Sequence, residues 1–262
     1  MIIVFDVGNT ETTIGLFDKS TLRAHWRIMT DVPRTADEFG VLLSGLLEGE
    51  GLDRSRVGDA SIGSVVPRVT APLTAACEQW LQAKRVTVID GSSPLPIRLD
   101  VDEPRTVGAD RIVNTLAASR LFGRDAVVVD LGTATTFDCI TADGVFIGGV
   151  IAPGVMVMAE TLFRRTSKLP ATELVPPKQV IGKNTEECVR AGVMLGAAEL
   201  IDGIVRRIRE VWPGAEAPMV IATGGLADTF APLCRSFEHV DPFLTLQGLR
   251  IAHELLVGGV AD

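Results

Sequence analysis

The alternation of apolar and polar residues predicts a strand hairpin at the start of the chain. Residues 2–6, IIVFD, form a short apolar run that ends in an acid and a glycine turn, as a buried strand does. Residues 12–18, TTIGLFD, alternate enough to form a return strand. We therefore expect a hairpin over residues 2–18 whose tip carries Asp6, Gly8, Asn9 and Thr10.

The same pattern returns in the middle of the chain. Residues 126–143, AVVVDLGTATTFDCITAD, read as an apolar strand, an acid with a glycine turn, and a threonine-rich second strand. Aligning the two acids matches three positions: Asp6 with Asp130, Gly8 with Gly132, and Asn9 with Thr133. Each copy opens about half the chain, which is what duplication of a half-domain leaves behind.

Helical periodicity and further apolar runs fill the rest of each half. Helices are expected at 35–51, 109–123 and 187–212, with Gly51 and Gly123 as stop signals for the first two. Further strands are expected at 59–66, 85–90 and 218–225. Strand hairpins mixed with helices predict an α/β fold of two related lobes. We place the N-terminal lobe at 1–122 and the C-terminal lobe at 123–262.

The composition and charge of the chain indicate what kind of molecule it binds. Of 262 residues 47% are hydrophobic and 22% charged, which is ordinary globular usage. The formal net charge is −8 and no block of basic residues occurs, so nucleic acid and anionic membranes are disfavoured as partners. The N-terminus has no basic leader and no apolar run approaches a membrane span. We expect a cytoplasmic protein that acts on small molecules.

Cysteine and histidine spacing gives no sign of metal or disulfide chemistry. The cysteines lack close pairs, and the histidines are isolated from one another: Cys77, Cys139, Cys188 and Cys234; His25, His239 and His253. We expect buried or idle thiols and structural or surface histidines.

The two acid–glycine turns suit phosphate chemistry. Glycine lets the backbone approach a phosphate, while threonine, asparagine and exposed N–H groups donate hydrogen bonds. Asp6 offers an oxygen for Mg²⁺, directly or through water, and Asp130 offers a second anionic oxygen for a cation. One such turn alone favours an ordinary β-turn, but two in register reverse that preference and favour a clamp on the β- and γ-phosphates. A third glycine turn, 222–227, either admits adenine or is a simple strand-to-helix turn.

Residues 106–114, TVGADRIVN, place Asp110 and Arg111 at the start of an expected helix, directly after a glycine. Two interpretations stay open. Asp110 caps the helix, where a carboxylate is electrostatically favoured. Alternatively, Asp110 accepts the proton of an attacking hydroxyl while Arg111 steadies substrate or phosphate charge.

With these motifs in place, the chain resembles the type III pantothenate kinases of the acetate kinase, sugar kinase, Hsp70 and actin superfamily. Five blocks carry the resemblance: DVGNTETTIGLF, VGADRIVN, VVVDLGTATTFD, GGVIAPG at 148–154, and IGKNTEECVRAG at 181–192. It implies two lobes of the actin-like (ribonuclease H-like) ATPase fold with an interlobe cleft. It also implies ATP-dependent phosphorylation of pantothenate to 4'-phosphopantothenate, the first step of coenzyme A biosynthesis.

The resemblance further implies roles for single residues. ATP would be held by the first phosphate loop and by one threonine of the second: Asp6, Val7, Gly8, Asn9, Thr10, Glu11, Thr12, Thr13 and Thr133. Pantothenate would be held by Gly108, Ala109, Asp110 and Arg111, with Asp110 as general base. Asp130 would bind a monovalent cation, K⁺ or NH₄⁺, beside the Mg²⁺ of ATP. Thr185 would reach pantothenate from the partner subunit of a homodimer, so that the active site is shared. Val101 stands where the family often has a tyrosine.

Two other functions compete with this reading. The turns would look alike in another small-molecule kinase of the superfamily, acting on a sugar or a carboxylic acid. A non-catalytic regulatory protein that binds a nucleotide would also keep them, although Asp6, Asp110, Arg111 and Asp130 are all intact here.

Overall fold

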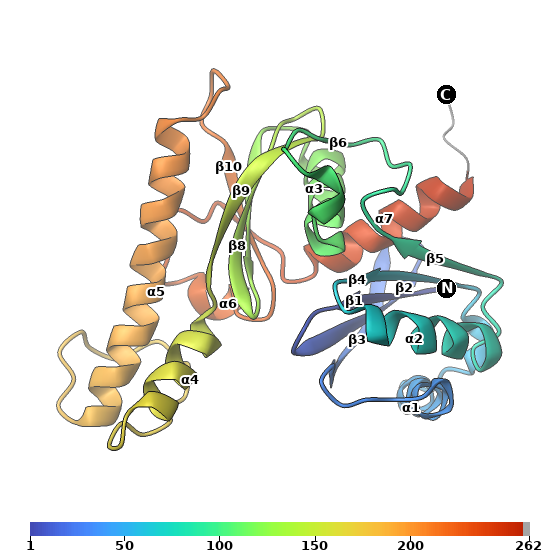
Figure 1. Ribbon diagram of the computed structural model, residues 1–262, viewed down its shortest axis with the longest axis horizontal. Coiled ribbons are helices and arrows are strands. Elements are labelled where there is room, and N and C mark those ends of the chain that lie inside the picture. The colour runs from blue at the N-terminus through green and yellow to red at the C-terminus, as the bar shows by residue number, and fades with distance from the viewer. Residues whose placement is uncertain (259–262) are drawn as a thin grey trace. The chain divides into compact units, whose positions relative to one another are not determined.

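The computed structural model describes residues 1–258 and divides into two compact units, each mixed α/β (Figure 1). The first unit is Met1–Arg120 together with residues 245–258, and the second is Leu121–Leu244. We expected the C-terminal lobe to run on to residue 262. The last helix, α7 (Leu244–Gly258), groups instead with the first unit, because Leu246 and Leu249 pack on the glycines of its sheet.

The first unit is built on one five-stranded sheet. Its strands are β1 (Ile2–Val7), β2 (Glu11–Asp18), β3 (Thr21–Met29), β4 (Asp59–Ser64) and β5 (Arg85–Ile89), in the order β3-β2-β1-β4-β5. The first three strands pair antiparallel, which confirms the hairpin expected over residues 2–18. β4 pairs parallel with β1, and β5 parallel with β4.

Helices cover both faces of this sheet. The remaining elements of the first unit are α1 (Ala36–Gly49), η1 (Arg54–Arg56), α2 (Pro67–Gln79), β6 (Arg98–Leu99), η2 (Pro104–Thr106) and α3 (Ala109–Phe122). The side chains of Ile3, Phe5 and Val7 form one apolar core with α1 and α2. The alternate face, where Gly15 and Gly63 lie, receives Leu246 and Leu249 of α7. Figure 1 shows α1 and α2 on one side of the sheet and α7 on the other.

Local signals place α1 where the periodicity predicts it. Thr35 accepts a hydrogen bond from the backbone N–H of Glu38, and the Glu38 carboxylate accepts one from the N–H of Thr35. This reciprocal capping box satisfies two of the free N–H groups at the helix start. Gly51 follows the helix with φ +69°, a left-handed conformation that glycine adopts without steric cost.

The second unit repeats the strand order of the first. Its strands are β7 (Ala126–Leu131), β8 (Ala134–Ile140), β9 (Val145–Pro153), β10 (Met219–Thr223) and β11 (His239–Val240), in the order β11-β10-β7-β8-β9. β7, β8 and β9 pair antiparallel in succession, while β10 pairs parallel with β7 and β11 parallel with β10. The duplication expected from the two hairpins is therefore confirmed at the level of topology.

One apolar core holds the second unit together. Its helices are α4 (Val155–Arg165), α5 (Thr185–Glu210) and α6 (Ala227–Phe230). Met194, Ile201 and Val205 of α5 pack with β7 and β10 side chains such as Val129 and Val220. At roughly 1.5–3 kcal/mol for each fully buried large apolar side chain, this cluster is the main stabilising contribution of the unit. No helix within residues 1–258 is long and apolar enough to cross a membrane.

The cysteines form no disulfide in the folded chain. Three of them, Cys77, Cys139 and Cys234, are buried, and Cys188 is exposed. Burial raises the pKa of Cys77 to about 12, and burial likewise raises the pKa of Cys234 to about 12. Neither thiol therefore ionises near neutral pH, as expected for cysteines that serve in packing.

α7 carries one buried histidine. The Nδ1 atom of His253 lies 3.0 Å from the Thr87 hydroxyl, and its Nε2 lies 3.4 Å from the Asp59 carboxylate. Asp59 also accepts two hydrogen bonds from Arg85, and Glu254 adds a further negative charge. Burial lowers the pKa of His253 below its ordinary value of 6.5, although Asp59 acts in the opposite direction.

The lowered pKa of His253 predicts a pH dependence of stability. The unfolded chain binds the imidazole proton more readily than the folded chain, so the free energy of unfolding decreases as pH falls below the unfolded pKa. Urea unfolding at about pH 7.5 and about pH 5.5 measures this loss. We expect a smaller loss in His253→Gln, which cannot titrate. An equal loss in both proteins would contradict the assignment.

Candidate functional site

The first acid–glycine turn lies at the carboxyl end of β1. Asp6 pairs in register with Thr13, and Val7 with Thr12, so the turn between the strands consists of residues 8–10. The Gly8 N–H donates to the Glu11 carbonyl at 3.0 Å and closes the turn. Residues 9–11 are exposed, so the polar tip expected from the sequence faces solvent.

A buried pair of hydroxyls supports this turn from below. Thr12 and Thr30 are both buried, and their hydroxyl oxygens lie 2.8 Å apart. The Thr30 N–H also donates to the Thr10 carbonyl at 2.8 Å. The hydroxyl of Thr12 therefore holds the turn to the segment after β3, whereas the exposed members of the predicted loop are Asn9, Thr10 and Glu11.

The start of α3 lies at the same end of the sheet as Asp6. Gly63 of β4 is the parallel neighbour of Asp6, and a Cβ placed on Gly63 would lie 3.6 Å from the Cβ of Ala109. Val65 donates its N–H to the Val7 carbonyl at 3.1 Å, and its side chain lies 3.3 Å from where a Cβ on Gly108 would be. The first turn and the GADR segment, about a hundred residues apart in sequence, are thus brought together.

Asp110 is half-buried in the first turn of α3. Its Oδ1 accepts a hydrogen bond from the Arg111 N–H at 2.9 Å, the local contact expected of a carboxylate at a helix start. The same oxygen would collide with any Cβ at Gly108, so the carboxylate folds back over that glycine. Capping of the helix and a chemical role at the strand ends are therefore compatible in one side chain.

The second acid–glycine turn is similar but one residue shorter. Asp130 pairs in register with Thr136, as Asp6 does with Thr13. The Gly132 N–H donates to the Ala134 carbonyl at 3.1 Å. A Cβ on Gly154, at the end of the GGVIAPG block, would overlap the carbonyls of Gly132 and Thr133, so only glycine lets the chain pass so close to this turn.

Asp130 lies among groups that fit a cation. Thr223 of β10 is its parallel neighbour, and the Thr223 hydroxyl is buried without a hydrogen-bond partner among the described residues. Gly224 follows with φ +88°, and a Cβ there would collide with the Asp130 carboxylate. No group of three or more His, Cys, Asp or Glu side chains within residues 1–258 is arranged to hold a metal ion. A cation bound by Asp130 would therefore need further oxygen ligands, from hydroxyl, carbonyl or phosphate groups.

Thr185 is the first residue of α5 in the second unit and is exposed. The side chain of the preceding Asn184 accepts a hydrogen bond from the Glu187 N–H at 2.9 Å and caps the helix. Thr185 is therefore a surface residue with its hydroxyl available to solvent or to a partner.

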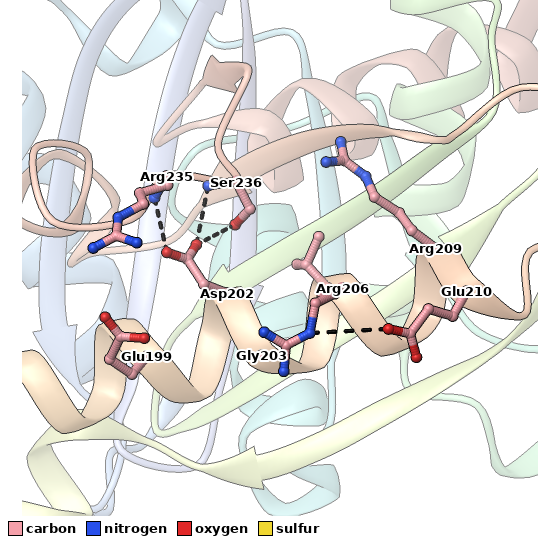
Figure 2. A pocket seen from close by; sticks show the side chains of 9 residues that line it. Glu199, Asp202, Gly203, Arg206, Arg209, Glu210, Arg235 and Ser236 are labelled. Atoms are coloured by element: carbon pink, nitrogen blue, oxygen red, sulfur yellow. Dashed lines mark hydrogen bonds and ion pairs between the residues drawn. The ribbon is translucent and has the colours of Figure 1, made fainter.

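A hollow of about 570 Å³ lies beside the C-terminal half of α5 (Figure 2). Asp202 accepts hydrogen bonds from the backbone N–H groups of Arg235 and Ser236, and Arg206 faces Glu210. Both acidic and basic side chains line it, and the lining residues include no member of the site expected from the sequence. We assign the hollow no part in nucleotide binding.

Two α/β units of identical strand order, each with an acid and a glycine turn at the carboxyl end of its first strand, define the actin-like ATPase fold used by sugar kinases. Solved structures agree. A putative 2-dehydro-3-deoxygalactonokinase from Sinorhizobium meliloti is 14% identical with a TM-score of 0.58, and covers 100% of this chain and 98% of its own. MreB 5 of Spiroplasma citri is 11% identical with a TM-score of 0.54, over 99% and 97%. At these identities the likeness concerns the fold alone.

Sequence comparison then gives the family. The family model for type III pantothenate kinase matches residues 2–207. A type III pantothenate kinase of Moorella thermoacetica is 43% identical over 97% of this chain and 99% of its own length. The chain belongs to the type III pantothenate kinase family.

Several residues of the site were not singled out from the sequence. Gly63 and Val65 lie in an expected strand, but only the tertiary structure places Gly63 beside Ala109 and Val65 beside Gly108. Gly154 and Gly224 were noticed as parts of glycine-containing segments, without a contact to explain them. In the sequence, the one feature that points to these positions is a glycine at or near the end of an apolar run.

The contact between Gly224 and Asp130 predicts the effect of a single methyl group. Gly224→Ala forces a side chain into positive φ and against the Asp130 carboxylate, which we expect to lower the free energy of unfolding by about 1–3 kcal/mol. Gly203→Ala in α5 is the matched control, because no atom lies within 4 Å of its Cβ position. Urea denaturation of both variants measures the difference. Equal stability would mean that the Gly224 turn is loose.

Proposed function

We propose that this protein phosphorylates pantothenate to 4'-phosphopantothenate with ATP, the first step of coenzyme A biosynthesis. The observation that carries the proposal is the meeting of Asp6 and the GADR segment at one end of the first sheet, in a chain of the type III pantothenate kinase family. Such a meeting gives a phosphate loop and a candidate base a common location.

The proposed ATP site uses backbone and small polar groups from both turns. Its residues are Asp6, Val7, Gly8, Asn9, Thr10, Glu11, Thr12 and Thr13 in the first unit, and Thr133 in the second. Glycine and free N–H groups suit close contact with phosphate oxygens. Asp6 would hold Mg²⁺ directly or through water, and the ion would supply charge neutralisation on the phosphates.

Asp110 is the proposed general base, within a pantothenate pocket of Gly108, Ala109, Asp110 and Arg111. A positioned base typically contributes about 10²–10⁴-fold to the rate. Arg111 would steady the negative charge of the substrate or of the transferred phosphoryl group. Most of the remaining acceleration would come from alignment of the hydroxyl with the γ-phosphate.

Asp130 is the proposed ligand of a monovalent cation, K⁺ or NH₄⁺. Support comes from its half-buried carboxylate and from the neighbouring buried Thr223 hydroxyl. The cation would supply positive charge close to the second turn and so lower the electrostatic cost of bound ATP.

The first experiment measures ADP release by the purified protein with ATP and Mg²⁺, with and without pantothenate, in K⁺ and in Na⁺ buffer. We expect release that requires pantothenate and increases with K⁺. Folded protein that releases no ADP in response to pantothenate in either buffer would contradict the proposed substrate. Equal rates in K⁺ and Na⁺ would contradict the cation role of Asp130 alone.

Asp110→Asn is the companion variant for this assay. It keeps the size of the side chain and removes the base, so turnover should fall by about 10²–10⁴-fold while ATP binding, measured by calorimetry, stays nearly unchanged. Normal turnover would show that another group accepts the proton.

The competing functions separate in the same assay. A panel of sugars and carboxylic acids tests for another kinase of the superfamily. A regulatory protein that binds nucleotide without catalysis would release no ADP with any acceptor. Membership of the family favours pantothenate over both.

We further propose a homodimer whose active site takes Thr185 from the partner subunit. Large apolar side chains are exposed on one stretch of the second unit, in β9, α4 and the segment before α5: Val150, Ile151, Met156, Phe163, Val180 and Ile181. Exposed apolar residues in such number favour a protein partner. A second copy of the chain would cover them and place Thr185, near Ile181 in sequence, in an interface.

The dimer proposal predicts that one charge abolishes both assembly and activity. Ile151→Asp places a carboxylate on an exposed apolar strand, so we expect a monomer by analytical ultracentrifugation and a large loss of turnover. Val211→Asp, at an equally exposed residue that follows α5, should leave the dimer intact. A wild-type protein that is monomeric and active, with a rate proportional to concentration on dilution, would refute the shared site.

A further inference from the structure

A buried polar pair joins α3 to α7 inside the first unit. Asn114 is 1% exposed and Thr245 is 6% exposed, and the Thr245 hydroxyl donates to the Asn114 side-chain oxygen at 2.9 Å. The two residues are 131 positions apart in sequence. Burial of two polar side chains carries a desolvation cost that an apolar pair of the same shape would not have. The net contribution of this hydrogen bond to stability is therefore small, about 0.5–1.5 kcal/mol, whereas its effect on geometry is direct.

The hydrogen bond adds a directional contact to the close packing of the two helices. Gly248 of α7 sits directly on the backbone of Val113, where a Cβ would overlap the Val113 carbonyl. Dispersion and apolar burial are non-directional and tolerate small slides or rotations of one helix on the other. A buried hydrogen bond between side chains is directional and selects one arrangement.

A second long-range hydrogen bond ties α7 to the sheet. The Ser61 hydroxyl, fully buried in β4, donates to the Leu249 carbonyl at 3.1 Å. β4 in turn pairs with β1 so that Gly63 stands beside Asp6. A series of contacts therefore connects the turn after β1 to the sheet, the sheet to α7, and α7 to α3. Asn114 is the last member of this series.

Asn114 also lies on the same face of α3 as Asp110, the candidate base, so a shift of the helix at Asn114 would move Asp110. It lies four residues after Asp110, which is one helical turn and the same face. A rotation or slide of α3 at Asn114 would move Asp110 by a similar amount. Displacement of a reacting group by about 1 Å can cost on the order of 10²-fold in rate.

We propose that Asn114 and Thr245 are positioning residues, which fix the Asp110 carboxylate relative to the phosphate turn at Asp6. This inference rests on the proposed phosphoryl transfer to pantothenate. Neither residue touches substrate; both act through the placement of α3.

The test separates positioning from stability with a pair of apolar replacements. Thr245→Val removes the donor and leaves the Asn114 oxygen buried without it, so both the melting temperature and kcat should fall. In the double variant Asn114→Leu/Thr245→Val, side chains of the same branching replace both partners, and the melting temperature should recover most of the loss. Its kcat should remain about tenfold or more below wild type, with KM for ATP changed less than about twofold. Thr245→Ser keeps the hydroxyl and should retain wild-type kcat.

Each outcome has one meaning. A double variant that regains both melting temperature and kcat would overturn the inference, because activity would then follow stability alone. A Thr245→Ser variant as slow as Thr245→Val would also overturn it, since the hydroxyl would not be the group that matters. If the double variant does not fold, Thr245→Val and Thr245→Ser, assayed well below their melting temperatures, decide the question. Wild-type protein without pantothenate-dependent ADP release would instead refute the proposed function, whatever the variants do.

Discussion

Both units depend on one constraint, the parallel pairing of an acid-bearing strand with a neighbour that has a glycine next to its carboxyl end. In the first sheet Asp6 stands beside Gly63, and in the second Asp130 stands beside Thr223, directly before Gly224. Parallel strands bring their carboxyl ends to one edge, where the chain leaves the sheet and backbone groups become available. A side chain on either glycine would collide with Leu249 or with the Asp130 carboxylate itself, so the edge stays open only because these positions are glycine.

α7, the last helix, connects this edge of the first sheet to the rest of the first unit. α7 packs on the sheet through Gly15 and Gly63 and on α3 through Gly248. Each contact brings a helix closer than a side chain would permit. Two buried hydrogen bonds add directional contacts to this packing: α7 accepts one from Ser61, and Thr245 of α7 donates the other. The same interface therefore combines non-directional packing with directional hydrogen bonds.

Much of the local structure could be read directly from residue patterns. The hairpin over residues 2–18 and the helices begun near Thr35 and Ala109 agree with the structure, as do the strands at 59–66 and 85–90. Capping residues, glycine stops and runs of apolar residues act within a few positions, so their signal survives without a fold. α2 and α7 escaped notice. α2 contains Pro72, which obscures its periodicity, and α7 gives little sign of which lobe it joins.

The sequence by itself determined that the chain contains two copies of an acid–glycine hairpin, and its motifs gave the family, because both are properties of contiguous residues. Only the tertiary structure decided that α7 returns to the first sheet and that Ala109 approaches Gly63. The same holds for Thr245, which meets Asn114 across 131 positions. Such contacts follow from the closure of long loops around a common core, and no pattern within either segment specifies its distant partner. The placement of the start of α3, which carries Asp110, at the same end of the sheet as the first acid–glycine turn belongs to this second class.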